Sequence, residues 1–286
     1  MPFAPLTDRA TIALRGEAAE GFLQNLVTSD VSRLQTGEAR PSALLTPQGK
    51  ILFDFLLSRI DDGVRVDCAA GARGDLIKRL TLYRLRTKIA IEPEDVGVVA
   101  IFDEETAPQG ALRDMRFADQ PVYRLYGMPP AGMTEAEPTA FVRLRVQTGV
   151  AEAERDFPAS DVFPHDVLLD QNGGVSFAKG CYVGQEVVSR MQHRGTARRR
   201  LMLIEAERHL TPGANIEAGS KVIGTVLTAS GTEGIGLVRI DRVADALAGD
   251  ATLSADGVPL TVTVPPWAGY TLPMPGDAEA APAEGA

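Results

Sequence analysis

The run FAKGCYVGQEVVSR, residues 177–190, places one of the two cysteines of the chain between glycines and beside a lysine. From Val183 onward, apolar residues recur at the spacing of one helix face, which predicts a helix that begins at or just after Cys181. Unpaired backbone N–H groups and the helix dipole stabilise a thiolate at such a position, and Lys179 adds positive charge. The pattern is typical of a reactive thiol at Cys181, but it leaves a second interpretation equally open. A small buried packing residue is the alternative.

Three other features are considered as candidate functional residues: one carboxylate, a cluster of arginines and the second cysteine. Asp54 lies in the apolar run ILFDFLLS, so its carboxylate is either on the exposed side of a strand or buried with a raised pKa. Five arginines lie between Arg190 and Arg200, and they form either a solvated helix end and linker or a site for phosphate or carboxylate. Cys68, at the end of a predicted strand, is interpreted as a packing residue.

Composition excludes several classes of protein. The chain has 286 residues, 44% of them hydrophobic, which indicates a globular protein with a core. No apolar run approaches the roughly 20 residues of a membrane span, and the N-terminus lacks the pattern of a signal peptide, so we expect a cytoplasmic protein without membrane contact. A net charge of −9 argues against a general nucleic-acid binder. Two distant cysteines and three histidines predict neither a disulfide framework nor a metal site.

The first half of the chain mixes strands and helices. The sequence predicts a strand over 11–14 and a helix around Phe22 to Val27. A β-meander follows, with turns at 47–50 and 61–63, and then a helix to about Leu85 and a strand over 88–92. Further on, the patterns predict a strand over 96–103, a helix within 133–152, and a strand that ends at Lys179 and Gly180. Strict alternation of strand and helix is missing, which favours an α+β architecture.

After Arg200 the pattern changes to short β-rich runs separated by Gly and Pro turns, which predicts a small antiparallel barrel or sandwich. We expect a body over residues 1–198, a C-terminal β-barrel over 199–272, and a disordered tail over 273–286.

The stretch KGCYVGQE, preceded by GGVSF, resembles the signature of the bacterial YgfZ family and its mitochondrial counterpart, folate-binding-type proteins involved in iron–sulfur cluster assembly and repair. These belong to the aminomethyltransferase superfamily, named for the T-protein of the glycine cleavage system. FLQNLVTSDVSRLQTGEA and TPQGKILFDFLL also resemble that superfamily. The resemblance covers about residues 10–270.

The resemblance implies an aminomethyltransferase-like folate-binding body of intertwined subdomains around a central cavity, with a C-terminal β-barrel packed on it. Tetrahydrofolate is the cofactor expected in that cavity, beside the KGCYVGQE loop, and its glutamyl carboxylates suit arginine. Cys181, Lys179 and Asp54 are the expected catalytic residues. The expected cofactor contacts are Gln147, Tyr182, Gly184, Gln185, Glu186, Arg190 and Arg198.

Two departures from the superfamily pattern bear on activity. The aminomethyltransferases have an Asp pair where this chain has Phe53 and Asp54, which makes glycine cleavage unlikely. They also have a glutamate that pairs with the pterin where this chain has Gln147. A glutamine accepts through one oxygen and loses the charge-assisted component, so we expect reduced folate affinity.

Three functions remain open from the sequence. The first is a folate-binding accessory factor that assembles or repairs iron–sulfur proteins through the Cys181 thiol, with client or assembly proteins as partners. Cluster ligation shared with a partner, thiol or persulfide exchange, and one-carbon transfer are all open at that sulfur. The second is a folate-dependent one-carbon transferase that acts on a small amine or RNA, with Asp54 as general base. The third is a ligand-sensing scaffold without turnover.

Overall fold

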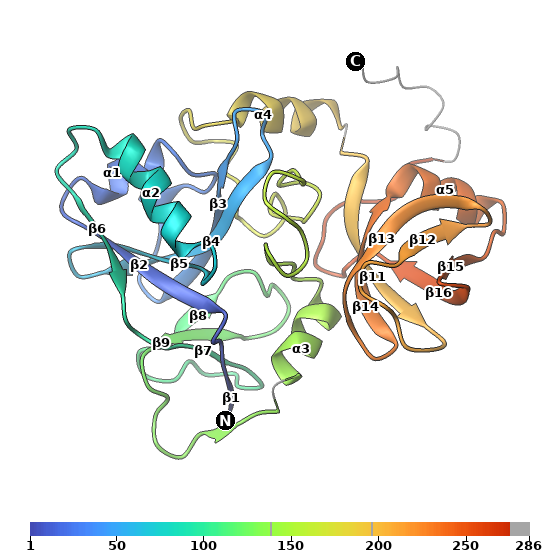
Figure 1. Cartoon of the computed structure of the whole chain (residues 1–286), viewed down its shortest axis with the longest axis horizontal. Coiled ribbons are helices and arrows are strands. Elements are labelled where there is room, and N and C mark those ends of the chain that lie inside the picture. The colour runs from blue at the N-terminus through green and yellow to red at the C-terminus, as the bar shows by residue number, and fades with distance from the viewer. Residues whose placement is uncertain (138, 196, 275–286) are drawn as a thin grey trace.

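The computed structural model describes residues 1–137, 139–195 and 197–274. Within them, the chain forms a body built on one mixed sheet and a closed β-barrel beside it (Figure 1). The predicted tail over 273–286 lies almost entirely outside the described residues. The α+β class with a C-terminal barrel is confirmed.

The strands of the body form a sheet of ten strands within the described residues, in the order β10-β1-β7-β9-β8-β3-β4-β5-β2-β6. The strands are β1 (Pro2–Pro5), β2 (Arg9–Arg15), β3 (Glu38–Leu45), β4 (Ile51–Ile60), β5 (Gly63–Ala69), β6 (Ala90–Glu94), β7 (Val98–Ile101), β8 (Leu112–Asp114), β9 (Tyr123–Tyr126) and β10 (Thr134–Glu135). The pairs β1–β10 and β3–β8 are parallel, and the other pairs are antiparallel. The predicted meander is therefore present as β3, β4 and β5.

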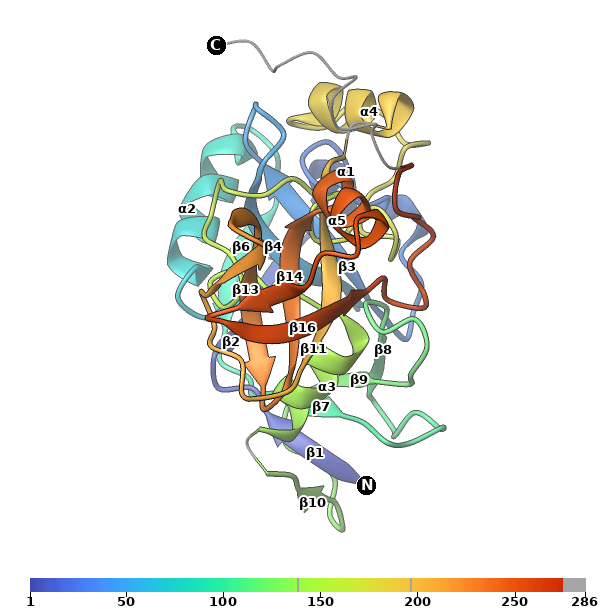
Figure 2. The same cartoon turned by 90° about the vertical axis from the view of Figure 1, so that its right-hand side faces the viewer.

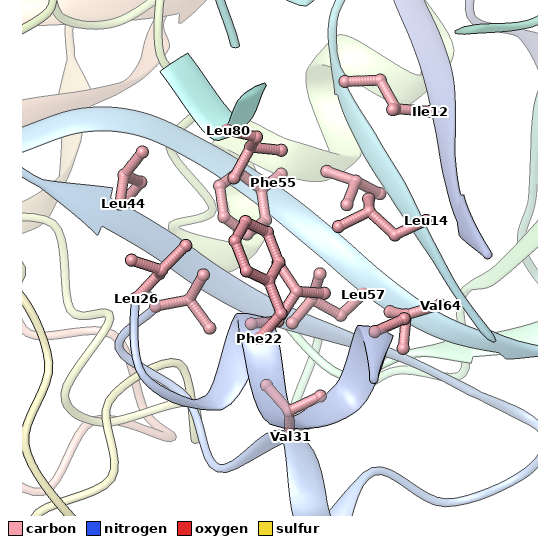
Figure 3. Close-up of a cluster of buried hydrophobic side chains, with 14 of the residues drawn as sticks. Ile12, Leu14, Phe22, Leu26, Val31, Leu44, Phe55, Leu57, Val64 and Leu80 are labelled. Atoms are coloured by element: carbon pink, nitrogen blue, oxygen red, sulfur yellow. The ribbon is translucent and has the colours of Figure 1, made fainter. Parts of the chain in front are cut away.

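Helices cover one part of this sheet and bridge to the barrel. They are α1 (Ala19–Gln24), the 3-10 helix η1 (Val31–Arg33), α2 (Arg73–Arg84), α3 (Ala140–Thr148) and α4 (Gln185–Arg194). Phe22 of α1 and Leu80 of α2 face Phe55 of β4 in the main core cluster, which also contains side chains of β2 (Figure 3). The apolar periodicity of both helices thus serves to cover β2, β4 and β5.

The barrel contains β11 (Arg199–Ala206), β12 (Asn215–Ala218), β13 (Lys221–Ser230), β14 (Glu233–Arg239), β15 (Leu253–Ala255) and β16 (Val258–Thr263). It closes because β11 pairs with both β14 and β16. The helix α5 (Ile240–Ala248) packs into the barrel core through one apolar side (Figure 2). A division of the chain between residues 198 and 199 remains a proposal, which the start of β11 at Arg199 supports.

The region between α3 and the barrel depends on one glycine. Gly149 ends α3 in the left-handed conformation, with φ +71°, and a Cβ atom there would lie 3.0 Å from Pro265 and 3.3 Å from Leu201. Trp267 Nε1 donates a hydrogen bond of 2.7 Å to the Thr148 carbonyl oxygen. The end of α3 is therefore packed directly against the barrel.

Two predicted elements differ in the structure. The helix predicted within 133–152 is limited to Ala140–Thr148, because Thr134 and Glu135 pair with β1 instead and Gly149 stops the helix. The strand predicted to end at Lys179 and Gly180 is wrong, since residues 173–180 form turns and bends. No helix in the described residues is both long and apolar enough to cross a bilayer.

Candidate functional site

Lys179 anchors the loop that contains Cys181. Its Nζ atom is buried and donates hydrogen bonds of 2.7 Å to the Val27 carbonyl oxygen and 2.8 Å to the Ser29 carbonyl oxygen. The Tyr182 ring lies 5.2 Å from the same nitrogen, a cation–π arrangement. Burial lowers the pKa of Lys179 to about 8, and nearby Asp30 opposes this shift. The lysine was predicted to support the thiol, and its contacts show that it fastens the loop to the segment after α1.

Two glycines hold the other end of the loop against the β3–β4 hairpin. Gly184 has φ +77°, and a Cβ atom there would lie 2.5 Å from the Thr46 carbonyl oxygen. Gly49, in the hairpin turn, has φ +82°, and its Cβ would lie 2.9 Å from the Val187 Cβ. Both the backbone conformation and the close approach require glycine. The two sequence motifs are therefore in direct contact, with α4 over the hairpin tip (Figure 1).

Cys181 lies between these two anchors and is exposed. The helix α4 begins at Gln185, four residues later than the cysteine, with Gly184 as its N-cap. The helix expected to begin at or just after Cys181 therefore begins one turn later, because the left-handed Gly184 separates the loop from the helix. In the described parts of the chain, no group of three His, Cys, Asp or Glu side chains is placed to hold a metal ion.

The second cysteine, Cys68, differs from Cys181 in its exposure to solvent. It is fully buried in β5, and burial raises the pKa of its thiol to about 12. A thiol in this state is protonated near neutral pH and inaccessible. Its interpretation as a packing residue agrees with this environment, so Cys181 is the cysteine available for chemistry.

The residues after Cys181 divide into structural and exposed groups. Tyr182 is buried, which raises the pKa of its hydroxyl to about 12, and its backbone N–H donates to Gln185 Oε1 at 3.3 Å. Glu186 and Arg190 lie on the exposed side of α4, 3.7 Å apart, with side chains 85% and 57% exposed. Such a pair contributes little to stability. The Glu186–Arg190 pair is therefore available to a ligand or partner. Tyr182 and Gln185, in contrast, stabilise the loop.

The arginines that end the predicted basic patch mostly hold the barrel to the body. Arg199 Nη2 contacts Asp166 Oδ2 at 2.7 Å, and Arg200 Nη1 contacts Asp170 Oδ1 at 2.8 Å. Arg198 is partly buried, and its carbonyl oxygen accepts a hydrogen bond from the Ile240 N–H. Arg199 and Arg200 therefore match neither alternative from the sequence, because they belong to β11 and are paired with carboxylates of the body.

Asp54 lies away from this loop, between two hollows of the body. It lines an outer groove of about 430 Å³ beside α2, and it also lines an interior cavity of about 20 Å³ with Arg9 and Arg116. Its Oδ1 atom is buried without a hydrogen-bond partner. Burial raises the pKa of Asp54, and Arg9 opposes this shift. Asp54 therefore combines the two interpretations made from the sequence: the residue is half-buried beside an open groove, but its Oδ1 atom is buried and its pKa is raised.

A buried network of charges occupies the centre of the body, and it was not predicted. Glu152 is its hub: Oε1 accepts from Arg116 Nη1 at 2.7 Å, and Oε2 lies 3.4 Å from Arg145 Nε. Arg124, with no exposed surface, donates to Asp114 Oδ2 at 3.0 Å. These arginines hold the pKa of Glu152 well below its usual range. The only signal of this network in the sequence is a single charged residue inside an apolar run, as in PVYRLYG.

Gln147 faces the barrel. Its Nε2 atom donates to Glu233 Oε2 at 2.9 Å, and the side chain is exposed. The structure thus brings Lys179, Tyr182 and Gly184 together around Cys181. Asp54 and Gln147 lie in separate environments, one beside α2 and the other between α3 and β14.

The chain is similar to proteins named iron–sulfur cluster assembly factor IBA57, mitochondrial. It is 30% identical to the protein from Mus musculus over 303 residues, which covers 92% of this chain and 84% of that protein. It is 30% identical to the protein from Homo sapiens over 308 residues, with the same coverage of 92% and 84%. Residues 198–270 match the family model described as CAF17, C-terminal beta-barrel domain.

A solved structure with the same fold is the glycine cleavage system aminomethyltransferase T from Bartonella henselae. It matches with a TM-score of 0.71 at 16% sequence identity, and the match covers 93% of this chain and 86% of that one. The aminomethyltransferase-like fold expected from the sequence is therefore confirmed.

The cellular location predicted from the sequence needs correction. The relatives from mouse and human, and a homologue from Pyricularia oryzae, are all named as mitochondrial proteins. The expectation of a cytoplasmic protein was based on the missing signal-peptide pattern, which is a different pattern from that of a mitochondrial targeting segment. These relatives point to mitochondria instead.

Proposed function

Because the chain belongs to the family of IBA57 iron–sulfur cluster assembly factors, we propose that it takes part in iron–sulfur cluster assembly through the thiol of Cys181. The observation that carries this proposal is an exposed cysteine in a loop that is fixed at both ends, by Lys179 on one side and Gly184 on the other. An anchored loop presents the sulfur to another protein at a defined position.

Among the three chemistries open at the sulfur, ligation of a cluster shared with a partner fits this site best. A thiolate is the common protein ligand of iron–sulfur clusters, and the thiol releases its proton when it binds iron. The described residues offer no further group of metal ligands around Cys181. The cluster is therefore cargo, and a partner protein supplies its other ligands.

The accessibility of the two cysteines tests this proposal directly. We expect Ellman's reagent to modify one thiol per native chain, and none in native Cys181→Ser, because Cys68 is buried and its pKa is raised. A Cys68→Ala variant is the matched control and should react like the unmodified chain. Denaturation should expose the second thiol. A native Cys181 that resists the reagent would refute its proposed role.

The folate implied by the family resemblance does not fit the small cavity that Asp54 shares with Arg9 and Arg116. The cavity between Asp54 and Arg9 has about 20 Å³, room for about one water molecule. Sites for ligands of drug size have about 300–1,000 Å³. Gln147, the expected partner of the pterin, is hydrogen-bonded to Glu233. The proposed function includes no step that uses folate.

An anaerobic calorimetric titration with tetrahydrofolate checks this conclusion. We expect no saturable binding tighter than about 100 μM, either to the unmodified chain or to Gln147→Glu. The variant should not restore binding, because its new carboxylate would lie against Glu233. Micromolar binding to the unmodified chain would contradict this conclusion, and it would make one-carbon chemistry a candidate function again.

The transferase alternative, with Asp54 as general base, remains a prediction. Phe53 replaces one carboxylate of the expected pair, and Asp54 lies outside the group of residues that surrounds Cys181. No contact in the described residues links the two. We therefore propose no second function.

A further inference from the structure

The end of α2 exposes apolar side chains that the fold does not use. Leu82 and Leu85 are 69% and 87% exposed. Leu85 follows the helix with φ +45°, in the left-handed region that disfavours a leucine. Large exposed apolar side chains that lie together are typical of interaction surfaces. Nothing in the proposed role of Cys181 accounts for them.

Three basic residues lie within six positions of these leucines along the chain. Arg79, Arg86 and Lys88 are exposed, and none has a carboxylate within ion-pair distance in the described ranges. The chain as a whole carries a net charge of −9, so this is a local reversal of sign. We call these five residues, Arg79, Leu82, Leu85, Arg86 and Lys88, the α2 patch. Its charge selects an anionic partner.

The α2 patch continues into the outer groove beside α2. Arg79 and Leu82 form part of the wall of that groove, whose volume is about 430 Å³, and Phe53 and Leu52 form part of the apolar wall. The groove is therefore large enough to accept an apolar side chain next to the basic residues. This concave shape suits a peptide segment better than a flat bilayer.

Two acidic groups of the groove lie toward the other end of the helix, and the third, Asp54, lies on β4. Asp75, in the first turn of α2, is paired with Lys78 at 2.9 Å. The Glu154 carboxylate lies against Gly71, just before α2, where a Cβ atom would be 2.8 Å from Oε2. The helix has 12 residues and spans about 18 Å. Charge thus changes from negative to positive along the groove, which gives a bound segment a direction.

We propose that the α2 patch and its groove bind a segment of a partner protein that combines acidic side chains with a leucine-like apolar side chain. The apolar side chain enters the groove beside Leu82, and the acidic side chains meet Arg79, Arg86 and Lys88. This surface is separate from the Cys181 loop and goes beyond the proposed function. It supplies a second contact for a partner.

Fluorescence anisotropy with a fluorescein-labelled synthetic peptide of 12 residues, composed only of Glu, Asp and Leu, tests the proposal on the full chain. We expect saturable binding that weakens with salt. Arg79→Glu with Arg86→Glu should raise the Kd about tenfold or more, and Leu82→Ser with Leu85→Ser should do the same. The variant Cys181→Ser should bind like the unmodified chain, so this test is independent of the thiol.

Matched controls change the same chemistry elsewhere. Arg208→Glu with Lys221→Glu reverses two exposed charges on the barrel, and Met128→Ser with Leu247→Ser removes two exposed apolar side chains. Neither pair should alter the Kd. Circular dichroism confirms that each variant is folded.

Several results would overturn the proposal. They are the absence of saturable peptide binding, and an equal loss of binding in the control variants. Two further results would assign the surface to another occupant. The first is binding of vesicles of phosphatidylcholine and phosphatidylglycerol, but not of the peptide, that the α2 variants abolish. The second is a dimer of the unmodified chain in sedimentation velocity that dissociates when Leu82 and Leu85 become serine.

Discussion

A strain that lacks its own assembly factor should not regain the activity of its iron–sulfur enzymes when it receives the Cys181→Ser chain. We expect enzyme activities of about a tenth or less of those restored by the unmodified chain. Serine has nearly the same size but presents a hydroxyl, which is a much poorer ligand for iron–sulfur clusters than a thiolate. Cys181 is exposed, so the substitution should leave the fold intact.

The Cys68→Ala variant is the control for this experiment, because it leaves Cys181 as the sole cysteine. It should restore enzyme activity as the unmodified chain does, provided that protein levels are equal by immunoblot. Full rescue by Cys181→Ser at equal protein levels would contradict the proposed function. That result would not bear on the inference about the α2 patch, which does not depend on Cys181.

Glu152→Gln should produce the largest loss of stability in the molecule. The substitution keeps the shape of the side chain but removes the negative charge that faces Arg116 and Arg145. Removal of one partner from a buried charge network leaves an uncompensated buried charge, and this costs about 3–5 kcal/mol. Chemical denaturation at pH 7 measures the free energy of unfolding. Glu154→Gln, at an exposed position two residues away, should change it by less than about 0.5 kcal/mol.

The difference in the free energy of unfolding between the unmodified chain and Glu152→Gln should depend on pH in one direction. The pKa of Glu152 is lowered in the folded chain, so its stabilising contribution is complete above the pKa of the unfolded chain. That contribution is lost as the pH falls through the lowered folded value. The difference between the unmodified chain and Glu152→Gln should therefore be full at pH 7 and shrink below about pH 4.5. A difference that stays constant down to pH 3 would contradict this account.

Local patterns predicted much of the architecture. The meander over β3 to β5, the helix α2 and the late barrel all follow from periodicity and turn residues, which act over a few positions along the chain. The helix predicted after Cys181 is present too, but its start was misplaced. The left-handed conformation of Gly184 is imposed by contact with Thr46, which lies in a distant hairpin.

The contacts that define the site are of long range, which explains why the sequence did not reveal them. Lys179 was expected to act on the neighbouring sulfur, yet its hydrogen bonds go to Val27 and Ser29, about 150 residues earlier. The hub at Glu152 joins charges that are separated along the chain: Arg124 of β9, Arg145 of α3 and Arg116, which follows β8. The family resemblance predicted the fold and identified the motif. It did not predict that a buried network of charges occupies the centre of the body.

The anchoring of the Cys181 loop has a consequence for how a partner binds. Lys179 and Gly184 restrict the loop while the chain folds, so the conformational entropy of the loop is lost at that stage. A partner that meets a pre-organised loop does not bear that entropic cost during association. Even a short-lived encounter therefore finds the sulfur in place, and the complex does not need high affinity for a ligand to be exchanged before it dissociates.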